Sequence, residues 1–498
     1  MDEARRPARQ EESLDPEDWT RLRALGHRMV DDMLSYLQTV AERPVWRTMP
    51  DEVRRALARP LPLEPEGEEA AYRDFCDLVL PYPLGNIHPR FWGWVNGTGT
   101  PLGALAEMLA ATLNPNVAGF DQAAALVERQ VVDWLKEMLG YPKGASGLLV
   151  SGGSMANALA LAVARNTRAG FDVRRDGVQQ AGDRRLVLYA SRQTHSSVQK
   201  GVELLGLGSA ALCLLPVDAE LRLDTAALES RLRDDRRRGL RPFCVIGNAG
   251  TVNSGAIDDL NLIADLCARE NIWFHVDGAF GALAALSPGL RPRLAGMEKA
   301  DSLAFDLHKW MYLPYEAGCL LVRRPDDHRN SFAVIPEYLT RIPGGPAAAE
   351  SSFADLGIQL SRGFRALKVW MAVKADGARK YGRLIQQNVD QAEYLAGLVR
   401  RSDVLELTAP APLNIVCFRY KVPGRDDDAL NELNRAILVR LQESGVALPS
   451  YTTLDGRFCI RVAITNHRTR RPDLDLLVAE VTRLGASLAA GERRAPAP

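Results

Sequence analysis

The sequence has no excess of charge of either sign, and this argues against two classes of partner. Its 498 residues include 62 Lys and Arg and 62 Asp and Glu, so the formal net charge is zero. Without a net positive charge there is no electrostatic case for binding to nucleic acid or to an anionic membrane surface. The Arg-rich stretch at 231–242 is interleaved with Asp, which is typical of a solvated face.

Cysteine is also scarce, and the seven cysteines form no CxxC pair and no metal-ligand spacing. We therefore predict neither a disulfide framework nor a metal site. Several cysteines lie in apolar runs such as "FCVIG", which is typical of reduced, buried thiols in a cytoplasmic protein. No uncharged run is long enough to span a membrane, and the charged N-terminus has no apolar core of a secretory signal. These absences predict a cytoplasmic protein without a membrane span.

What the sequence does contain is an alternation of short apolar strands with helical patterns, beginning near residue 100. This alternation predicts an α/β fold with a mainly parallel sheet. At this length two or three folding units are expected. We assign residues 1–92 to an N-terminal helical segment that contains an amphipathic helix over 15–40. The large domain is expected at 93–380 and a smaller α+β domain at 381–498.

Three polar segments stand at places where a parallel sheet binds ligands. The first is "VSGGSMANALAL", where a strand, a small-residue turn and a helix follow one another and offer backbone amides to a phosphate. His195 follows a second strand, and Asp277 ends a third one in "HVDGAFG". Each feature also has an ordinary structural interpretation, as a tight turn, a helix cap or a core histidine.

A fourth segment, "DSLAFDLHKWMYLP", carries Lys309 into an apolar region. A lysine that extends its ammonium group back to water is the ordinary interpretation of such a residue. Together, however, a phosphate turn, an aromatic ring to stack, a strand-end carboxylate and a semi-buried lysine are what pyridoxal 5'-phosphate (PLP) needs. The carboxylate keeps the pyridine nitrogen protonated, and the lysine amine forms a Schiff base with the aldehyde.

With these motifs the sequence resembles the group II PLP-dependent decarboxylases, the family of aromatic-L-amino-acid and glutamate decarboxylases. The resemblance covers roughly residues 20–485 and is carried by "HPRFWGWVNG", "SGGSMANALAL", "THSSVQKG", "HVDGAFG" and "HKW". It implies fold type I, the aspartate-aminotransferase-like fold. It also implies a homodimer whose N-terminal helices interlock.

The resemblance assigns roles to single residues of this sequence. Lys309 is the Schiff-base lysine that forms the internal aldimine, and Asp277 is the partner of the pyridine nitrogen. His195 stacks on the cofactor ring and assists proton transfer. Gly153 and Ser154 contact the phosphate.

Five further positions follow from the same resemblance. Ala279 packs beneath the ring, and His308 is the histidine beside the lysine. Tyr338 falls where the family has a catalytic loop, whose tyrosine is proposed to protonate the quinonoid carbon. Asp306 departs from the pattern, because animal members usually have Asn there and a carboxylate repels phosphate; we place it near the cofactor only. In "GTVNSG", Val252 replaces a hydroxyl residue that is common in animal members, which leaves Thr251 as the nearer hydroxyl that could contact the cofactor.

The substrate is less determined than the reaction. Phe91, Trp92 and Trp94 lie where the family has a pocket wall, and aromatic walls favour a flat apolar side chain, although core aromatics would look the same. We identify no cation placed to hold a second carboxylate. The sequence therefore favours Trp, Tyr, Phe or dopa over Glu or Asp.

Alternatives to an aromatic-amino-acid decarboxylase stay open. One is a decarboxylase for a non-aromatic amino acid. Another is oxidative deamination to an aldehyde, which some relatives perform when the loop tyrosine is lost, whereas Tyr338 is present here. A third is a non-catalytic protein on this scaffold, against which Lys309, Asp277 and His195 are all retained.

Overall fold

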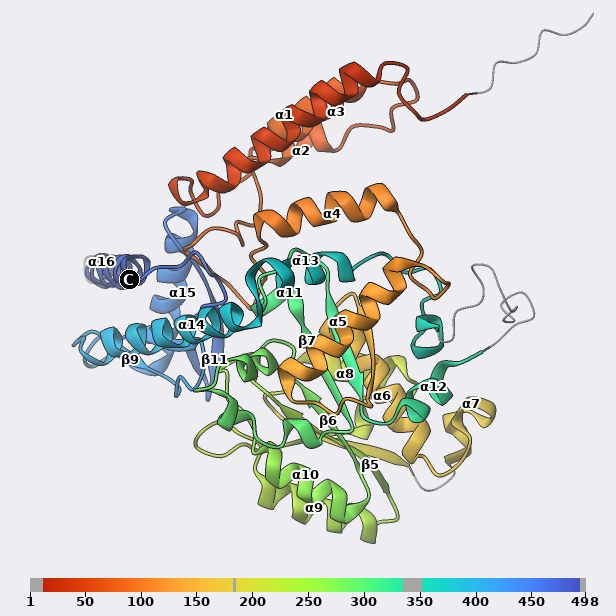
Figure 1. The fold of residues 1–498 in the computed structure, drawn as a ribbon. Coiled ribbons are helices and arrows are strands. Elements are labelled where there is room, and N and C mark those ends of the chain that lie inside the picture. The colour runs from red at the N-terminus through yellow and green to blue at the C-terminus, as the bar shows by residue number, and fades with distance from the viewer. Residues whose placement is uncertain (1–11, 182–184, 335–351, 493–498) are drawn as a thin grey trace, which may run out of the picture.

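Two sheets organise the chain in the computed structural model, which describes residues 12–181, 185–334 and 352–492. One sheet has seven strands and the other has five. Figure 1 shows helices around the larger sheet, with the smaller sheet and its helices to one side. The predicted fold class is confirmed: an α/β large domain, a smaller α+β unit and an N-terminal helical segment.

The seven-stranded sheet is mainly parallel. Its strands are β2 (Ser146–Val150), β3 (Leu186–Ser191), β4 (Leu212–Leu215), β5 (Arg241–Asn248), β6 (Trp273–Asp277), β7 (Ser302–Asp306) and β8 (Gly318–Val322). They lie in the order β2-β8-β7-β6-β5-β3-β4, and β8 runs antiparallel to both of its neighbours. The other neighbouring pairs are parallel, so the carboxyl ends of β3, β5, β6 and β7 lie at one edge.

Helices cover both faces of this sheet, so its strands are apolar on both sides. In β3, Leu186 and Leu188 face one apolar core while Val187 and Tyr189 face the other. The first core includes α6 (Gly153–Arg168) and α8 (Ser196–Leu204), and the second includes α5 (Ala123–Leu139), α9 (Thr225–Arg237), α10 (Leu260–Glu270) and α13 (Ala366–Asp376). The remaining helices of this region are α4 (Pro101–Leu113), α7 (Val173–Asp176), α11 (Leu307–Trp310) and α12 (Pro325–Phe332).

The five-stranded sheet combines segments from both ends of the chain. Its order is β1 (Phe91–Trp92), β11 (Leu448–Leu454), β12 (Arg457–Ala463), β10 (Ile415–Tyr420) and β9 (Leu405–Leu407). The associated helices are α14 (Ala378–Arg400), α15 (Asp427–Glu443) and α16 (Arg471–Glu492). Because β1 pairs with β11, residues that we assigned to the N-terminal segment contribute a strand to the C-terminal sheet.

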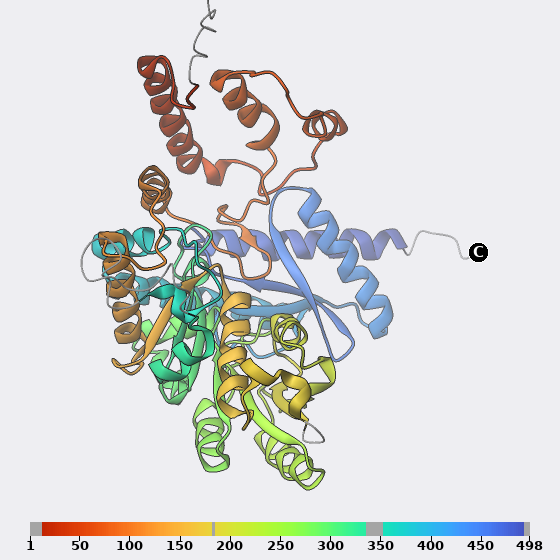
Figure 2. The same ribbon diagram turned by 90° about the vertical axis from the view of Figure 1, so that its right-hand side faces the viewer.

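The N-terminal helices α1 (Trp19–Gln38), α2 (Asp51–Leu57) and α3 (Glu68–Asp74) stand apart from both sheets (Figures 1 and 2). The helix that we predicted over 15–40 is α1, which is shorter than predicted. Its N-terminus is set by Asp18, whose carboxylate accepts hydrogen bonds from the backbone N–H groups of Thr20 and Arg21 and so caps the helix. Leu25 is the buried residue of α1. Within the described ranges, no helix combines the length and the apolar character that a bilayer crossing requires.

Candidate active site

A cavity of about 620 Å³ opens at the carboxyl edge of the parallel strands, where α/β sheets bind ligands. It is lined by residues from the β2–α6 turn, the start of α8, the ends of β6 and β7, and the segments around Val95 and Tyr315. The lining includes seven residues that the sequence singled out: Gly153, Ser154, His195, Ala279, Asp306, His308 and Lys309. Asp277 lies directly beneath this cavity, since it bonds to two of the lining residues.

The N-terminal end of α6 forms one wall of the cavity and is built to accept an anion. The first backbone N–H groups of a helix have no partner within it, and they carry the positive end of the helix dipole. Gly153 is closely surrounded, since a Cβ there would lie 3.0 Å from Asp306 Oδ2 and 3.1 Å from Ala279 Cβ, and these groups would have to shift to admit it. The glycine therefore lets the backbone approach a ligand closely, as the sequence predicted for a phosphate.

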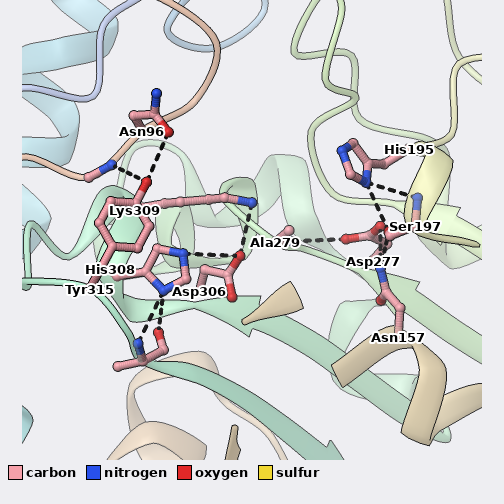
Figure 3. Close-up of polar contacts among 12 residues, drawn as sticks. Asn96, Asn157, His195, Ser197, Asp277, Ala279, Asp306, His308, Lys309 and Tyr315 are labelled. Carbon is pink, nitrogen blue, oxygen red and sulfur yellow. Dashed lines mark hydrogen bonds and ion pairs between the residues drawn. The ribbon is translucent and has the colours of Figure 1, made fainter. Parts of the chain in front are cut away.

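Lys309 and Asp306 form an ion pair at the cavity floor, with 2.9 Å between Nζ and Oδ2 (Figure 3). The Lys309 side chain is 23% exposed and the Asp306 side chain only 2%. Burial by itself lowers the pKa of Lys309, but the Asp306 carboxylate outweighs it and raises that pKa above its ordinary value. The other carboxylate oxygen of Asp306 is buried and has no hydrogen-bond partner in the described part of the chain.

His308 lies beside this ion pair and also lines the cavity. Its Nε2 lies 3.7 Å from Asp306 Oδ2, and its Nδ1 accepts a hydrogen bond of 3.2 Å from the backbone N–H of Ala317. Burial lowers the pKa of His308, although Asp306 opposes this shift. A neutral imidazole is the form that results at neutral pH.

Asp277 ends β6 with both carboxylate oxygens already engaged. Asn157 Nδ2 donates to Oδ2 at 2.9 Å, and the Ala279 backbone N–H donates to Oδ1 at 3.0 Å. The carboxylate is 95% buried and accepts hydrogen bonds only, so a further N–H donor is the group that it can take from the cavity.

His195 combines two of the interpretations that the sequence left open. It caps α8, because its Nδ1 accepts a hydrogen bond of 3.1 Å from the Ser197 backbone N–H, and its ring also lines the cavity. Burial lowers the pKa of His195, and the nearby Asp277 carboxylate partly opposes this effect.

Several lining residues were not found from the sequence. Tyr315 Oη donates to Asn96 Oδ1 at 2.9 Å and accepts from the Gly97 backbone N–H at 3.1 Å, which joins two distant segments at the cavity mouth. No local sequence pattern marks Tyr315 or Asn96 as a residue of the cavity. Asn157 did have one, since it is a polar residue in an otherwise Ala-rich, buried helix.

Three predicted residues lie elsewhere. The assignment of Trp92 to the substrate pocket is wrong: its side chain is fully buried in the core of the small domain, and its indole N–H donates to Thr469 Oγ1, because β1 pairs with β11. Phe91 likewise packs against Leu448 rather than the cavity. Thr251 bonds to Ser254 and does not line the cavity, so its cofactor contact is not seen.

The roles predicted for two other residues remain predictions. Trp94 is 52% exposed and does not line the cavity formed by the described residues. Tyr338 lies outside the described residues.

Comparison with known proteins gives one family. A sequence model described as the pyridoxal-dependent decarboxylase conserved domain matches residues 50–421. An aromatic-L-amino-acid decarboxylase of Bacillus atrophaeus is 35% identical and covers 93% of this chain and 95% of that protein. A phenylacetaldehyde synthase of Petunia hybrida is 29% identical over 93% of each chain. The crystal structure of Oryza sativa TDC with PLP and tryptamine has a TM-score of 0.88 at 26% identity, with 96% of this chain and all of that chain covered.

The site geometry and these likenesses agree. The cavity presents a lysine amine, a buried carboxylate acceptor and a helix N-terminus. The family match spans the segments that supply all three. The chain therefore belongs to the pyridoxal-dependent decarboxylase family and is a PLP-dependent amino-acid decarboxylase.

Proposed function

We propose that the substrate is an aromatic L-amino acid, which the enzyme converts to the corresponding amine and carbon dioxide. The observation that carries this proposal is the charge of the cavity wall. Among the described residues that line it, Lys309 is the single Lys or Arg, and Glu316 adds a negative charge that pairs with Arg365 at 2.8 Å. A substrate with a side-chain carboxylate would find no second cation here. The likeness to the Bacillus decarboxylase supports the same class.

The residues at the site fit PLP. The α6 N-terminus offers backbone N–H groups to the phosphate, and Gly153 and Ser154 stand at that end. Asp277 retains acceptor capacity for the pyridine N–H, and His195 and Ala279 line the cavity where they could contact the two ring faces. When bound, PLP supplies the electron sink into which the electrons of the broken Cα–carboxylate bond pass. We propose that Lys309 holds PLP covalently through Nζ.

Asp306 should slow the attachment of PLP to Lys309, because only the unprotonated amine attacks the aldehyde. The ion pair raises the pKa of Lys309, so we expect attachment to accelerate as the pH rises towards that pKa. In Asp306→Asn burial still lowers the pKa of Lys309, and only the smaller attractions of Asp277 and Tyr315 oppose it, so the pKa should fall and the rate at neutral pH should rise by about tenfold for each unit of change. Stopped-flow absorbance after mixing apoenzyme with PLP measures this rate.

A matched control is Asp265→Asn, which removes a carboxylate from an exposed pair with Lys299. This variant should attach PLP at the wild-type rate. An Asp306→Asn variant that attaches PLP no faster than wild type, with the same pH dependence, would contradict the assignment.

We propose that Tyr338 returns a proton to the substrate carbon after carbon dioxide leaves. In Tyr338→Phe we expect amine formation to fall by about a hundredfold, as is typical for the loss of a general acid. Part of the product should become the aldehyde. Chromatography of the products, with a peroxide assay, measures the partition. An unchanged rate of amine formation in Tyr338→Phe would exclude this role.

Oxidative deamination is the second candidate, favoured by the likeness to the Petunia phenylacetaldehyde synthase. Tyr338 argues against it, since we expect this route where the loop tyrosine is lost. A non-aromatic amino acid is a further alternative for the same chemistry.

We also propose that the enzyme is a homodimer in the cytoplasm. The N-terminal helices stand apart from the two sheets, and Trp19 on α1 is 61% exposed, which supports a second copy as their packing partner. The seven cysteines form no disulfide, which supports a reducing compartment.

The test of the proposed function is incubation of the PLP-loaded enzyme with a pool of L-amino acids. Mass analysis should reveal one amine, lighter than an aromatic parent by the mass of carbon dioxide. An amine from an acidic or aliphatic parent would replace the substrate class. Aldehyde with peroxide as the main products would favour the oxidative reaction.

A further inference from the structure

We propose that Asn157, anchored by His275, is the positioning residue that sets the hydrogen-bonding state of both Asp277 and His195. This inference rests on the proposed roles of those two residues beside PLP. Asn157 and His275 lie within the motifs described above, but neither was assigned a role there. Both are buried, and they connect the core of the large domain with the cavity.

A continuous hydrogen-bond chain carries this inference. The Trp273 indole N–H donates to Ser302 Oγ at 2.8 Å, and Ser302 Oγ lies 2.9 Å from His275 Nδ1. His275 Nε2 lies 2.9 Å from Asn157 Oδ1, and Asn157 Nδ2 donates to Asp277 Oδ2 at 2.9 Å. All five side chains are at least 95% buried. They come from β6, β7 and α6, so the chain crosses three elements.

The chemistry of its two ends gives the chain one direction. The indole is a donor only, so Ser302 Oγ accepts from it and keeps its own proton available for His275 Nδ1. At the other end, the Asp277 carboxylate is an acceptor only, so Asn157 must present its NH2 group there and its oxygen to His275. The orientation of the Asn157 amide places the proton of a neutral His275 on Nε2, and the Ser302 hydroxyl can then donate to Nδ1.

Burial of His275 agrees with this assignment. It lowers the pKa of His275 to about 4, against the opposing attraction of Asp277, so the ring is neutral at neutral pH. A protonated ring would carry a second N–H on Nδ1, directed at a hydroxyl group whose proton points the same way. The neutral ring satisfies every donor and acceptor of the chain.

Asn157 also reaches the other side of the cavity through its second amide proton. Nδ2 lies 3.1 Å from Ser197 Oγ, and Ser197 Oγ lies 2.9 Å from His195 Nδ1 (Figure 3). The Ser197 backbone N–H donates to the same Nδ1 at 3.1 Å, so that nitrogen is an acceptor. A neutral His195 therefore carries its proton on Nε2, which makes no hydrogen bond within the described residues.

One amide thus acts on both sides of the site. It donates to Asp277 Oδ2 and leaves that carboxylate with acceptor capacity for the pyridine N–H. It also donates to Ser197 Oγ, which directs the Ser197 hydroxyl proton to His195 Nδ1 and reinforces the tautomer that the Ser197 backbone N–H favours. A buried polar chain stabilises a fold only when every one of its donors and acceptors has a partner. If the chain had only a structural role, apolar side chains of similar size could therefore replace it.

The test compares variants of Asn157 and His275 by equilibrium binding of PLP to the full-length apoenzyme. Asn157→Leu removes both amide donors at similar volume, and it should weaken PLP binding by about tenfold to a hundredfold, because Asp277 loses a buried partner. His275→Leu should weaken it comparably. His275→Gln restores a donor near the position of Nε2 and should bind PLP within about threefold of wild type. The visible absorbance of bound PLP and its pH titration should shift in the two Leu variants.

Asn434→Leu is the matched control. Asn434 is another fully buried Asn, in the small domain, where it bonds to the backbone of Tyr420 and Leu430. This variant should lose thermal stability without a change in PLP affinity or absorbance. If Asn157→Leu and His275→Leu behave in the same way as this control, the proposal is overturned and the chain is structural.

Ser302→Ala keeps the proposal testable if the Leu variants do not fold. This variant removes the Ser302 hydroxyl proton that His275 Nδ1 accepts. The Nδ1 atom lies 3.2 Å from the Ser302 backbone oxygen, so it can instead carry a proton and donate to that oxygen, which changes the tautomer of the ring. Weaker PLP binding supports the directional chain, and wild-type binding refutes it. These measurements use no substrate, whereas amine formation by the wild-type enzyme tests the proposed function separately.

Discussion

Lys309→Ala should abolish covalent attachment of PLP and lower the rate of decarboxylation by about a thousandfold or more, because the only amine that lines the described cavity is lost. The visible absorbance band of the attached cofactor should disappear, and gel filtration should strip PLP from the variant. Absorbance and amine formation, measured on the same preparation, check this prediction.

Two further variants separate the chemistry of Lys309 from its charge. Lys309→Arg keeps a cation beside Asp306 but has no amine that forms a Schiff base, so it should be as inactive as Lys309→Ala. Lys200→Ala removes an exposed lysine of α8 and should leave both readouts at wild-type values. Substantial decarboxylation by Lys309→Arg would show that Lys309 acts as a charge alone.

Asp277→Asn should lower decarboxylation by about a hundredfold to a thousandfold, the range seen when one preorganised electrostatic group is removed from an active site. The carboxylate accepts from Asn157 Nδ2 and from the Ala279 backbone N–H. An amide in its place must turn its own NH2 towards one of these donors, and it lacks the charge that we propose holds a proton on the pyridine nitrogen. The measurement is kcat/KM together with the visible spectrum.

Asp277→Glu is the matched variant, since it keeps the charge and moves the carboxylate by one methylene. It should be less impaired than Asp277→Asn if the charge is the principal contribution. Equal activity of wild type and Asp277→Asn would mean that the pyridine nitrogen needs no anionic partner here, and it would remove the basis for the role of Asn157.

The parts of the site that could be predicted are those that a short segment contains by itself. The turn before α6, the end of β6 and the lysine after β7 each follow an apolar strand, and parallel strands bring their carboxyl ends to one edge. The pattern therefore placed Gly153, Asp277 and Lys309 together before any contact was known. Asn157 could have joined them, as a polar residue on a helix whose neighbours are buried alanines.

The aromatic residues before α4 show where prediction from a pattern fails. "FWGW" describes Phe91, Trp92 and Trp94 as large and apolar, which suits a pocket wall and a domain core equally. Pairing of β1 with β11, more than 350 residues away, sends Trp92 into the small-domain core. Such pairing depends on backbone hydrogen bonds between distant strands, and it leaves no mark on the local sequence.

The sequence by itself determined the fold class, the family and the lysine and carboxylate of the site, because strand period, turn chemistry and motif order are local properties. Only the tertiary structure decided that Asp306 pairs with Lys309, that Trp92 is a core residue and that Trp273, Ser302, His275 and Asn157 form one directional chain to Asp277. The physical reason is the same in each case. Hydrogen bonds and burial are properties of side chains that meet in space, and in the chain to Asp277 the link between α6 and β6 joins residues more than 100 positions apart.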